Sequence, residues 1–149
     1  MKTKIMYIEN KAYGHSGPAW IGFVEFSKSG QTIYFNGKAL KRLKNTGTYG
    51  NHFDIETGEE YWVSGIKKNG HNRHQFGSGK IMLEKNSVDE YLKLVDFNYI
   101  DKNYFEIVEC ISTDKNKFNK IENREVEFRN NSYRATFFDS NHRKLILDI

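Results

Sequence analysis

Turns marked by glycine most strongly limit what this chain can fold into. All twelve glycines lie between Gly14 and Gly79, where they separate short runs of β-branched and aromatic residues. Such runs, bounded by turn residues, are typical of strands, because helices need longer stretches of uninterrupted periodicity. An aromatic fraction of 15% supplies large rings for the core of a small domain. The pattern therefore predicts a mostly β protein.

The clearest local signal is a hairpin at Asn36-Gly37, between predicted strands at 31–35 and 38–43. Asn-Gly accepts the positive φ angles of a type I′ turn. The other early strands are expected at 4–9 and 19–27, and further hairpin turns at 56–59 and 69–70. About five to seven short strands joined by such turns favour a small SH3-like or related β-barrel.

One short helix is predicted near residues 87–95. Ser87 and Glu90 have the spacing of a capping box, and an apolar face recurs at helical spacing through Val95. Four further strands are expected at 104–111, 125–129, 133–138 and 144–149. We therefore divide the chain into a glycine-turn-rich basic β domain at 1–95 and a β-meander extension at 96–149. The extension either folds separately or shares the core of the first part.

Charge is distributed as unevenly as glycine. Residues 1–95 hold 14 Lys/Arg and 9 Asp/Glu, a net charge of +5, whereas residues 96–149 have a net charge of −1. The segments 26–53 and 61–83 carry Lys and Arg but no acid. An excess of positive charge in one part of a chain favours an anionic partner.

Several short sequence motifs in the first part of the chain form a specific pattern when they are taken together. They are Met6-Tyr7-Ile8-Glu9, Gly17-Pro18-Ala19, Ile21-Gly22, Phe26-Ser27-Lys28, Thr32-Ile33-Tyr34, and Asp54-Ile55-Glu56-Thr57-Gly58-Glu59 leading into Tyr61-Trp62-Val63-Ser64-Gly65 and Lys67-Lys68. Together, over residues 5–92, they resemble a family of short uncharacterised bacterial proteins. Members sometimes carry the label of a deoxyxylulose-phosphate synthase. That label does not fit, because a thiamine-diphosphate enzyme is far larger and needs a metal-and-pyrophosphate motif that this chain lacks. The resemblance implies a fold unit and no activity.

The segment 67–74 is the strongest candidate for a binding site. Its cations and imidazoles follow two aromatic residues closely, and a second basic pair precedes them on another predicted strand. The candidate residues are Lys67, Lys68, His71, Arg73, His74, Tyr61, Trp62, Lys41 and Arg42. Lys and Arg attract a nucleic-acid backbone, and an exposed ring stacks on a base. The alternative is a solvated hairpin tip, with Tyr61 or Trp62 in the core.

Two kinds of chemistry have weaker sequence support. His52, Asp54 and Glu56 share one face of a predicted strand, and with His71 and His74 they have a spacing that permits metal ligation. Such a face more often points to water, so we expect no metal and no cofactor. Cys110 lies in an apolar strand, where a thiol is usually a small buried hydrophobe. Neither a nucleophile elbow nor a phosphate-cradling loop is present, and an enzyme is therefore not favoured.

Three functional hypotheses follow. The first is a non-catalytic binding module whose basic face engages nucleic acid or an acidic protein. The second is an immunity or inhibitor protein that binds its partner through aromatic residues of the C-terminal part, namely Tyr99, Tyr104, Phe118, Phe128, Tyr133, Phe137 and Phe138. The third is a small hydrolase that uses His52, Asp54 and a histidine of 71–74. One cysteine and the lack of a long apolar run predict a cytoplasmic protein that does not enter the membrane.

Overall fold

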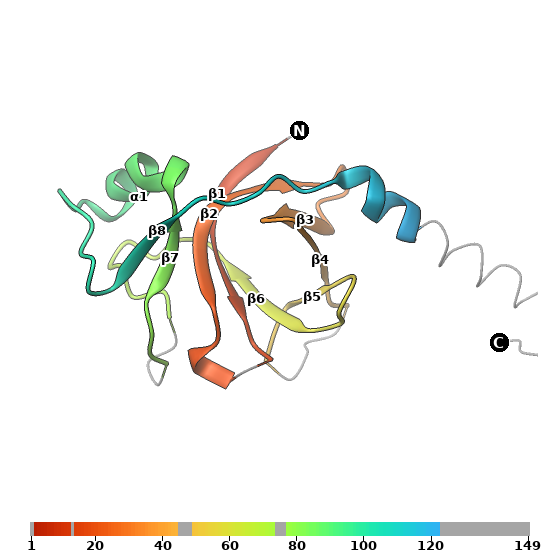
Figure 1. Cartoon of the computed structure of the whole chain (residues 1–149), viewed down its shortest axis with the longest axis horizontal. Helices are drawn as coiled ribbons and strands as arrows, with labels where there is room; N and C mark the ends of the chain where they lie inside the picture. Colours follow the sequence, from red (N-terminus) through yellow and green to blue (C-terminus); the bar gives the residue numbers. More distant parts are fainter. Residues whose placement is uncertain (1, 13, 45–48, 74–76, 123–149) are drawn as a thin grey trace, which may run out of the picture. The chain divides into compact units, whose positions relative to one another are not determined.

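Six strands close into an antiparallel barrel, as Figure 1 shows from one side. They are β1 (Thr3–Asn10), β2 (Ala19–Phe26), β3 (Thr32–Phe35), β4 (Lys38–Arg42), β5 (His52–Asp54) and β6 (Glu60–Ser64). Neighbours in sequence pair from β1 to β6, and β6 then pairs with β1, with Tyr7 opposite Ser64. This last pairing closes the ring and confirms the prediction of a small, mostly β barrel.

The structure is a computed structural model that describes residues 2–12, 14–44, 49–73 and 77–122. The chain divides into one compact unit at Met1–Thr113 and another at Asp114–Ile149. The first unit thus extends beyond residue 95, where the glycine and charge patterns change. None of the helices in the described ranges is long and apolar enough to cross a membrane.

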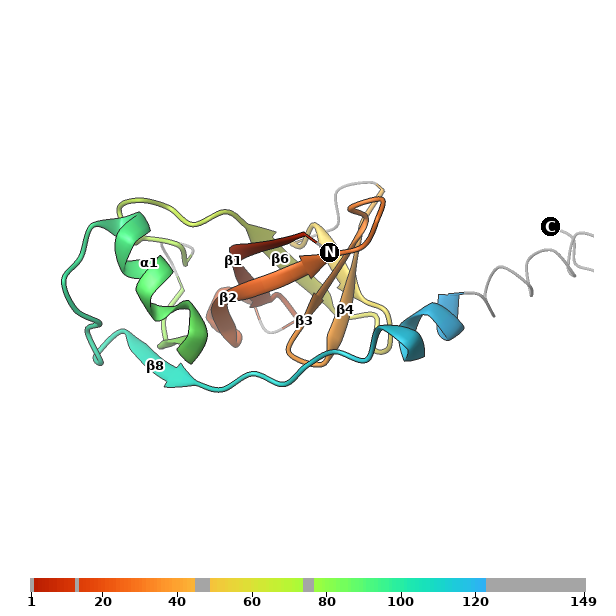
Figure 2. The same ribbon diagram turned by 90° about the horizontal axis from the view of Figure 1, so that it is seen from above.

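Two further strands and a helix lie beside the barrel (Figure 2). Strand β7 (Ile81–Glu84) pairs in parallel with the start of β2, through Trp20 opposite Met82, whereas the end of β2 pairs with β3. Strand β8 (Phe105–Val108) pairs in parallel with β7. Because β2 exchanges one neighbour for another along its length, it belongs both to the barrel and to the sheet outside it. Neither parallel pairing has a local sequence signal.

Two apolar clusters fill the unit, one on each side of β1 and β2. Ile8, Val24 and Leu40 lie in the cluster that fills the barrel. Tyr7 and Ile21, which point the other way, pack with Leu83, Tyr91, Val95 and Phe105 beneath helix α1 (Val88–Val95). Alternate residues of a strand face opposite sides, so β1 and β2 serve both cores. Strand β8 contributes Phe105 to the second core, which explains why the unit continues past the predicted boundary.

The predicted turn at Asn36-Gly37 is confirmed, whereas the helix cap at Ser87 and the turn at Gly70 differ from their predictions. Asn36 and Gly37 have φ angles of 48° and 77°, as the predicted hairpin turn requires. Helix α1 begins where the capping box was predicted, but Ser87 Oγ donates to Glu84 Oε1 at 2.8 Å instead of capping the helix. A preceding 3-10 turn, Lys85–Ser87, already holds residue 87 in a helical conformation. Gly70 N donates to Lys67 O in a turn, but the described residues on either side of this turn form no strand.

The described start of the second unit is a helix that the sequence patterns did not predict. Residues 115–122 are helical, and Asp114 Oδ1 accepts a hydrogen bond from Lys117 N at 3.2 Å. An aspartate in this position is a common helix N-cap. The strands predicted at 125–129, 133–138 and 144–149 lie outside the described residues.

Candidate functional site

A cleft with a volume of about 1430 Å³ lies beside β7 and α1. Its walls come from the segments 67–73, 77–81 and 96–105, and Tyr91 contributes from the helix. Pairing of β7 with β8 brings the two longer segments together, although residues 74–95 separate them along the chain. Pockets for small molecules usually measure roughly 300–1000 Å³, so this cleft has room for an extended ligand.

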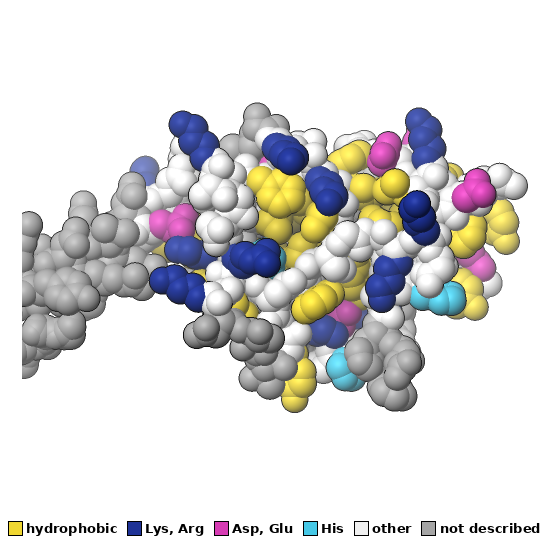
Figure 3. All heavy atoms as spheres, turned by 180° about the vertical axis from the view of Figure 1, so that it is seen from behind, with side chains coloured by type: hydrophobic (Ala, Val, Ile, Leu, Met, Phe, Trp, Pro, Cys, Tyr) yellow, Lys and Arg dark blue, Asp and Glu magenta, His cyan; other side chains and the backbone are white. Residues whose placement is uncertain are grey.

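Basic side chains and aromatic rings meet in this cleft. Lys67, His71 and Lys80 are exposed along one wall. Phe97, Tyr99 and Tyr104 line the cleft as well, with exposed fractions of 48%, 71% and 67%. The cleft also holds the carboxylates of Asp96 and Asp101; Asp101 Oδ1 accepts Asn103 N at 2.9 Å. Figure 3 shows Lys and Arg side chains spread over one face of the protein, among hydrophobic side chains.

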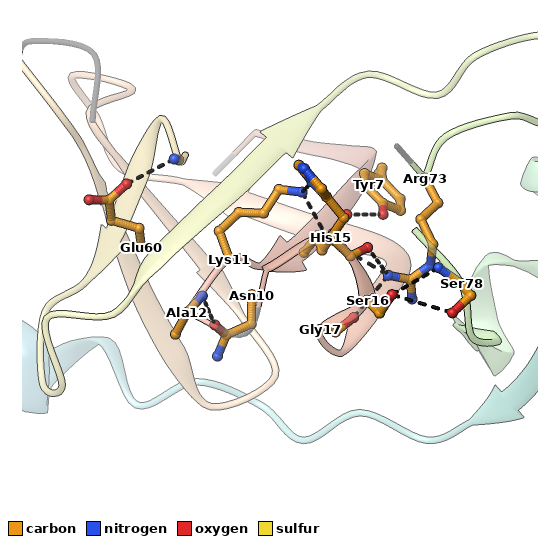
Figure 4. Close-up of polar contacts among 12 residues, drawn as sticks. Tyr7, Asn10, Lys11, Ala12, His15, Ser16, Gly17, Glu60, Arg73 and Ser78 are labelled. Atoms are coloured by element: carbon orange, nitrogen blue, oxygen red, sulfur yellow. Dashed lines mark hydrogen bonds and ion pairs between the residues drawn. The ribbon is translucent and has the colours of Figure 1, made fainter. Parts of the chain in front are cut away.

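A buried charged cluster holds one wall of the cleft against the barrel. We call Tyr7, Glu9, Lys11 and Arg73 the Glu9 cluster; Figure 4 labels Tyr7, Lys11 and Arg73. The Glu9 carboxylate is 1% exposed and accepts hydrogen bonds from Tyr7 Oη and, at 2.9 Å, from Lys11 Nζ. Arg73 Nη1 lies 3.7 Å from Glu9 Oε2. The paired cations offset the cost of burying a carboxylate.

The Arg73 side chain also joins its own segment to two others, residues 15–17 and Lys80. Its Nη1 donates to His15 O at 3.2 Å and to Gly17 O at 3.0 Å, and Nη2 lies 3.5 Å from Lys80 O. The Arg73 side chain is therefore an anchor of the loop that carries Lys67, His71 and Lys80. A role as an exposed phosphate contact, as the sequence suggested, does not fit these bonds.

The ionisation of Tyr7 reflects the same burial. Desolvation, together with the hydrogen bond to the Glu9 carboxylate, raises the pKa of Tyr7 well above its ordinary value. Tyr7 therefore remains a neutral donor to Glu9, and the cluster consists of one carboxylate and two cations. This arrangement explains how the charges are accommodated inside the protein.

The structure brings together some of the predicted binding residues and separates others. Lys67, His71 and Arg73 line the cleft, whereas Lys41 and Arg42 lie on β4 and do not. Tyr61 is buried in the barrel and Trp62 is 40% exposed on the opposite face of β6. Lys68 is exposed without lining the cleft, and His74 lies outside the described residues. The sequence reasoning did not include Lys80, Phe97, Tyr99 and Tyr104 among the residues of this site.

The polar face predicted on strand β5 points inward. His52 and Asp54 are 3% and 2% exposed, because they lie on the same face of the sheet as their partners Tyr61 and Leu40, which point into the barrel. Asp54 Oδ1 accepts Glu56 N at 2.8 Å, and Asp54 Oδ2 lies 3.8 Å from Lys38 Nζ. Within the described part of the chain, no group of three potential metal ligands converges. His52 and Asp54 therefore serve the barrel interior, away from His71 in the exposed loop.

His52 is held as a neutral imidazole. Burial, with a smaller contribution from the Arg42 charge, lowers the pKa of His52 to about 4. Its Nδ1 lies 2.9 Å from Asn51 Oδ1, an oxygen that also accepts Val63 N at 2.8 Å. Since Asn51 Oδ1 is the acceptor in both contacts, His52 donates through Nδ1.

Cys110 has no feature of a nucleophile. It is half-buried against the barrel cluster, and burial raises the pKa of its thiol to about 11. The Glu84 carboxylate adds to this effect. A thiol with a raised pKa is protonated at neutral pH and reacts slowly.

Comparisons with family models, with curated proteins and with solved structures found no match to this chain. The resemblance to short bacterial proteins stays a prediction.

Proposed function

We propose that this protein is a non-catalytic binding module that engages single-stranded nucleic acid through the cleft. The observation that carries the proposal is the meeting of Lys67, His71 and Lys80 with the exposed rings of Tyr99 and Tyr104 in one hollow. Cations that follow a phosphate backbone, combined with rings on which unpaired bases stack, are the usual elements of sequence-tolerant single-strand binding. The size of the cleft agrees with a ligand of several nucleotides.

Salt dependence tests the contribution of the cations. We expect the Lys67→Ala/Lys80→Ala variant to bind a mixed-sequence single-stranded oligonucleotide more weakly. If both amines contact phosphates, the slope of log affinity against log salt falls by about 1.4, since each contact contributes roughly 0.7. Fluorescence anisotropy over a range of salt concentrations measures this slope.

The matched control is Lys2→Ala/Lys28→Ala, which removes two exposed amines that do not line the cleft. This control separates a local site from the general adhesion of a basic protein to polyanions. Equal losses in the two double variants, or no binding by the wild type near physiological salt, would exclude the cleft as a nucleic-acid site.

Stacking is tested separately from charge. Each of Tyr99→Ala and Tyr104→Ala should lower the affinity by roughly 5- to 150-fold, the range expected for the loss of one stacked base. Trp62→Ala is the control, because Trp62 is exposed on the barrel outside the cleft. If only Trp62→Ala lowered the affinity, the binding surface would instead be the barrel face predicted from the sequence.

A second candidate function, a protein-binding role, is favoured by the outer edge of β8. This strand is the last in the sheet order, and it and its flanks expose Tyr104, Ile107 and Ile111 by 67%, 41% and 68%. Exposed apolar side chains along a sheet edge can anchor a partner protein. A photo-crosslinking residue in place of Ile107 should then link to a protein in native cell extract. The same residue in place of exposed Tyr49 should not.

A further inference from the structure

Three buried polar atoms at the cleft lack a hydrogen-bond partner among the described residues. They are Asn72 Nδ2, Arg73 Nε and the hydroxyl of Tyr91. Asn72 is 7% exposed, Tyr91 0%, and the Arg73 side chain 10%. Buried polar groups are nearly always paired, so three unpaired atoms at one cleft point to a ligand that pairs with them.

All three atoms are hydrogen-bond donors. Asn72 Oδ1 accepts Lys67 N at 2.8 Å, which orients the amide and leaves Nδ2 as the unpaired donor. Arg73 Nε–H has no capacity to accept. Burial raises the pKa of Tyr91, so the hydroxyl keeps its proton at neutral pH. Donors without acceptors select a group with several acceptor oxygens, and an anion binds them most strongly.

We propose that the floor of the cleft is a phosphate subsite, and that the preferred ligand is a nucleotide or oligonucleotide with a terminal phosphate. This inference rests on the proposed function and specifies the end of the strand that the cleft holds. A terminal phosphate presents three acceptor oxygens and has a sugar on one side only, whereas an internal phosphodiester presents two acceptor oxygens and has sugars on both sides. Lys67 and Lys80 line the same cleft and offset the negative charge.

The entrance to the subsite lies beside Gly70. A Cβ built on this glycine would lie 3.8 Å from the Tyr91 hydroxyl and 3.3 Å from Phe97 Cε2. Because residue 70 is a glycine, the space that a side chain would fill next to the Tyr91 hydroxyl and the Phe97 ring stays open. Phe97 is about half exposed.

The direct test compares ligands that differ in one group. Binding of a fluorescent single-stranded oligonucleotide is measured with a 5′-phosphate, with a 3′-phosphate and with hydroxyls at both ends, and AMP is compared with adenosine by calorimetry. We expect at least one phosphorylated end, and AMP over adenosine, to bind roughly tenfold or more tightly, as charge-assisted hydrogen bonds imply.

Two variants locate the preference at the floor of the cleft. Tyr91→Phe keeps the ring, which packs edge-on against Phe105 at 5.4 Å, and should reduce the preference for phosphate by roughly tenfold. Asn72→Asp keeps an acceptor for Lys67 N but replaces the donor with a carboxylate, and should abolish the preference. Arg73 is not used, because it anchors the loop. Asn98→Asp is the control, since it adds the same charge at an exposed position of the cleft.

Urea unfolding distinguishes a ligand contact of the Tyr91 hydroxyl from a structural role. The Tyr91 hydroxyl has no partner in the ligand-free protein, so Tyr91→Phe should leave the urea midpoint unchanged or raise it. A lower midpoint with an unchanged phosphate preference would assign the hydroxyl to structure and overturn the subsite.

The outcomes also separate the two proposals. Equal binding of phosphorylated and unphosphorylated oligonucleotides would overturn the subsite and leave nucleic-acid binding intact. Binding of AMP without binding of any oligonucleotide would support the subsite and exclude nucleic-acid binding. An equal loss in Asn98→Asp and Asn72→Asp would show that charge alone acts, and would overturn the assignment to Asn72.

Discussion

Protonation of His52 should destabilise the barrel below neutral pH. The imidazole is 3% exposed inside the barrel, and its pKa is lowered from 6.5 to about 4 by burial and by Arg42. Between these two values the unfolded chain takes up a proton that the folded chain does not. The contribution of His52 to stability is therefore complete above pH 6.5 and is lost as the pH falls toward 4.

The size of the effect follows from the two pKa values. Each pKa unit corresponds to about 1.4 kcal/mol, so the linkage relation gives a loss of about 2.5 kcal/mol between neutral pH and pH 4.5. With a urea m-value of roughly 1–3 kcal/mol per M, the unfolding midpoint should fall by roughly 0.8–2.5 M. A loss of this size is a large part of the stability of a small domain.

The assay is urea unfolding, followed by circular dichroism at several pH values, of the wild type and of His52→Gln. Carboxylates also titrate in this range, but they titrate in both proteins, so the difference between the two curves isolates His52. His71→Gln is the matched control, because His71 is exposed. If the difference between wild type and His52→Gln stayed constant from neutral pH to pH 4.5, the buried neutral imidazole would be refuted.

Three further results are expected. Lys11→Ala should lower the free energy of unfolding by about 3–5 kcal/mol, because it leaves the buried Glu9 carboxylate without its 2.9 Å cation; a loss below about 1 kcal/mol in urea titrations would contradict the cluster. A chain of residues 1–113 should unfold cooperatively on heating, whereas one that ends at residue 95 lacks Phe105 of the second core and should be less stable; equal midpoints would show that β8 adds nothing. Cys110 should react with a thiol reagent about 100-fold more slowly in the folded protein than in urea, since its pKa rises from 9.0 to about 11; equal rates would exclude this protection.

Local chemistry accounts for the features that could be predicted from the sequence. The turn at Asn36-Gly37 needs positive φ angles at two successive residues, and few dipeptides other than Asn-Gly adopt them readily. The helix at Val88–Val95 has its apolar residues at helical spacing. Hairpins between successive strands follow from short connections, and a run of such hairpins favours a barrel. These signals depend on residues close together in the chain.

The candidate site could be predicted only in part. The acid-free run from Tyr61 to Leu83 indicated a basic loop, and that loop does form one wall of the cleft. The aromatic residues Tyr99 and Tyr104 were assigned to a separate interface, because nothing in their own segment indicates that β8 pairs with β7. The basic run predicts Arg73 as an exposed phosphate contact. In the structure its Nη1 atom contacts Glu9 and two backbone carbonyls, so this end of the side chain is an anchor.

By itself, therefore, the sequence determined the turns, most of the strands and the short helix, since these depend on backbone preferences and on the period of the apolar residues. The tertiary structure alone decided which side chains face inward and which distant segments meet. Closure of β6 onto β1 buries His52, whose strand had been expected to point to water. Parallel pairing of Trp20 with Met82 places β7, and then β8, beside the barrel and so creates the cleft. The free energy of these pairings comes from burying a shared core, and this term is absent from any single segment of the chain.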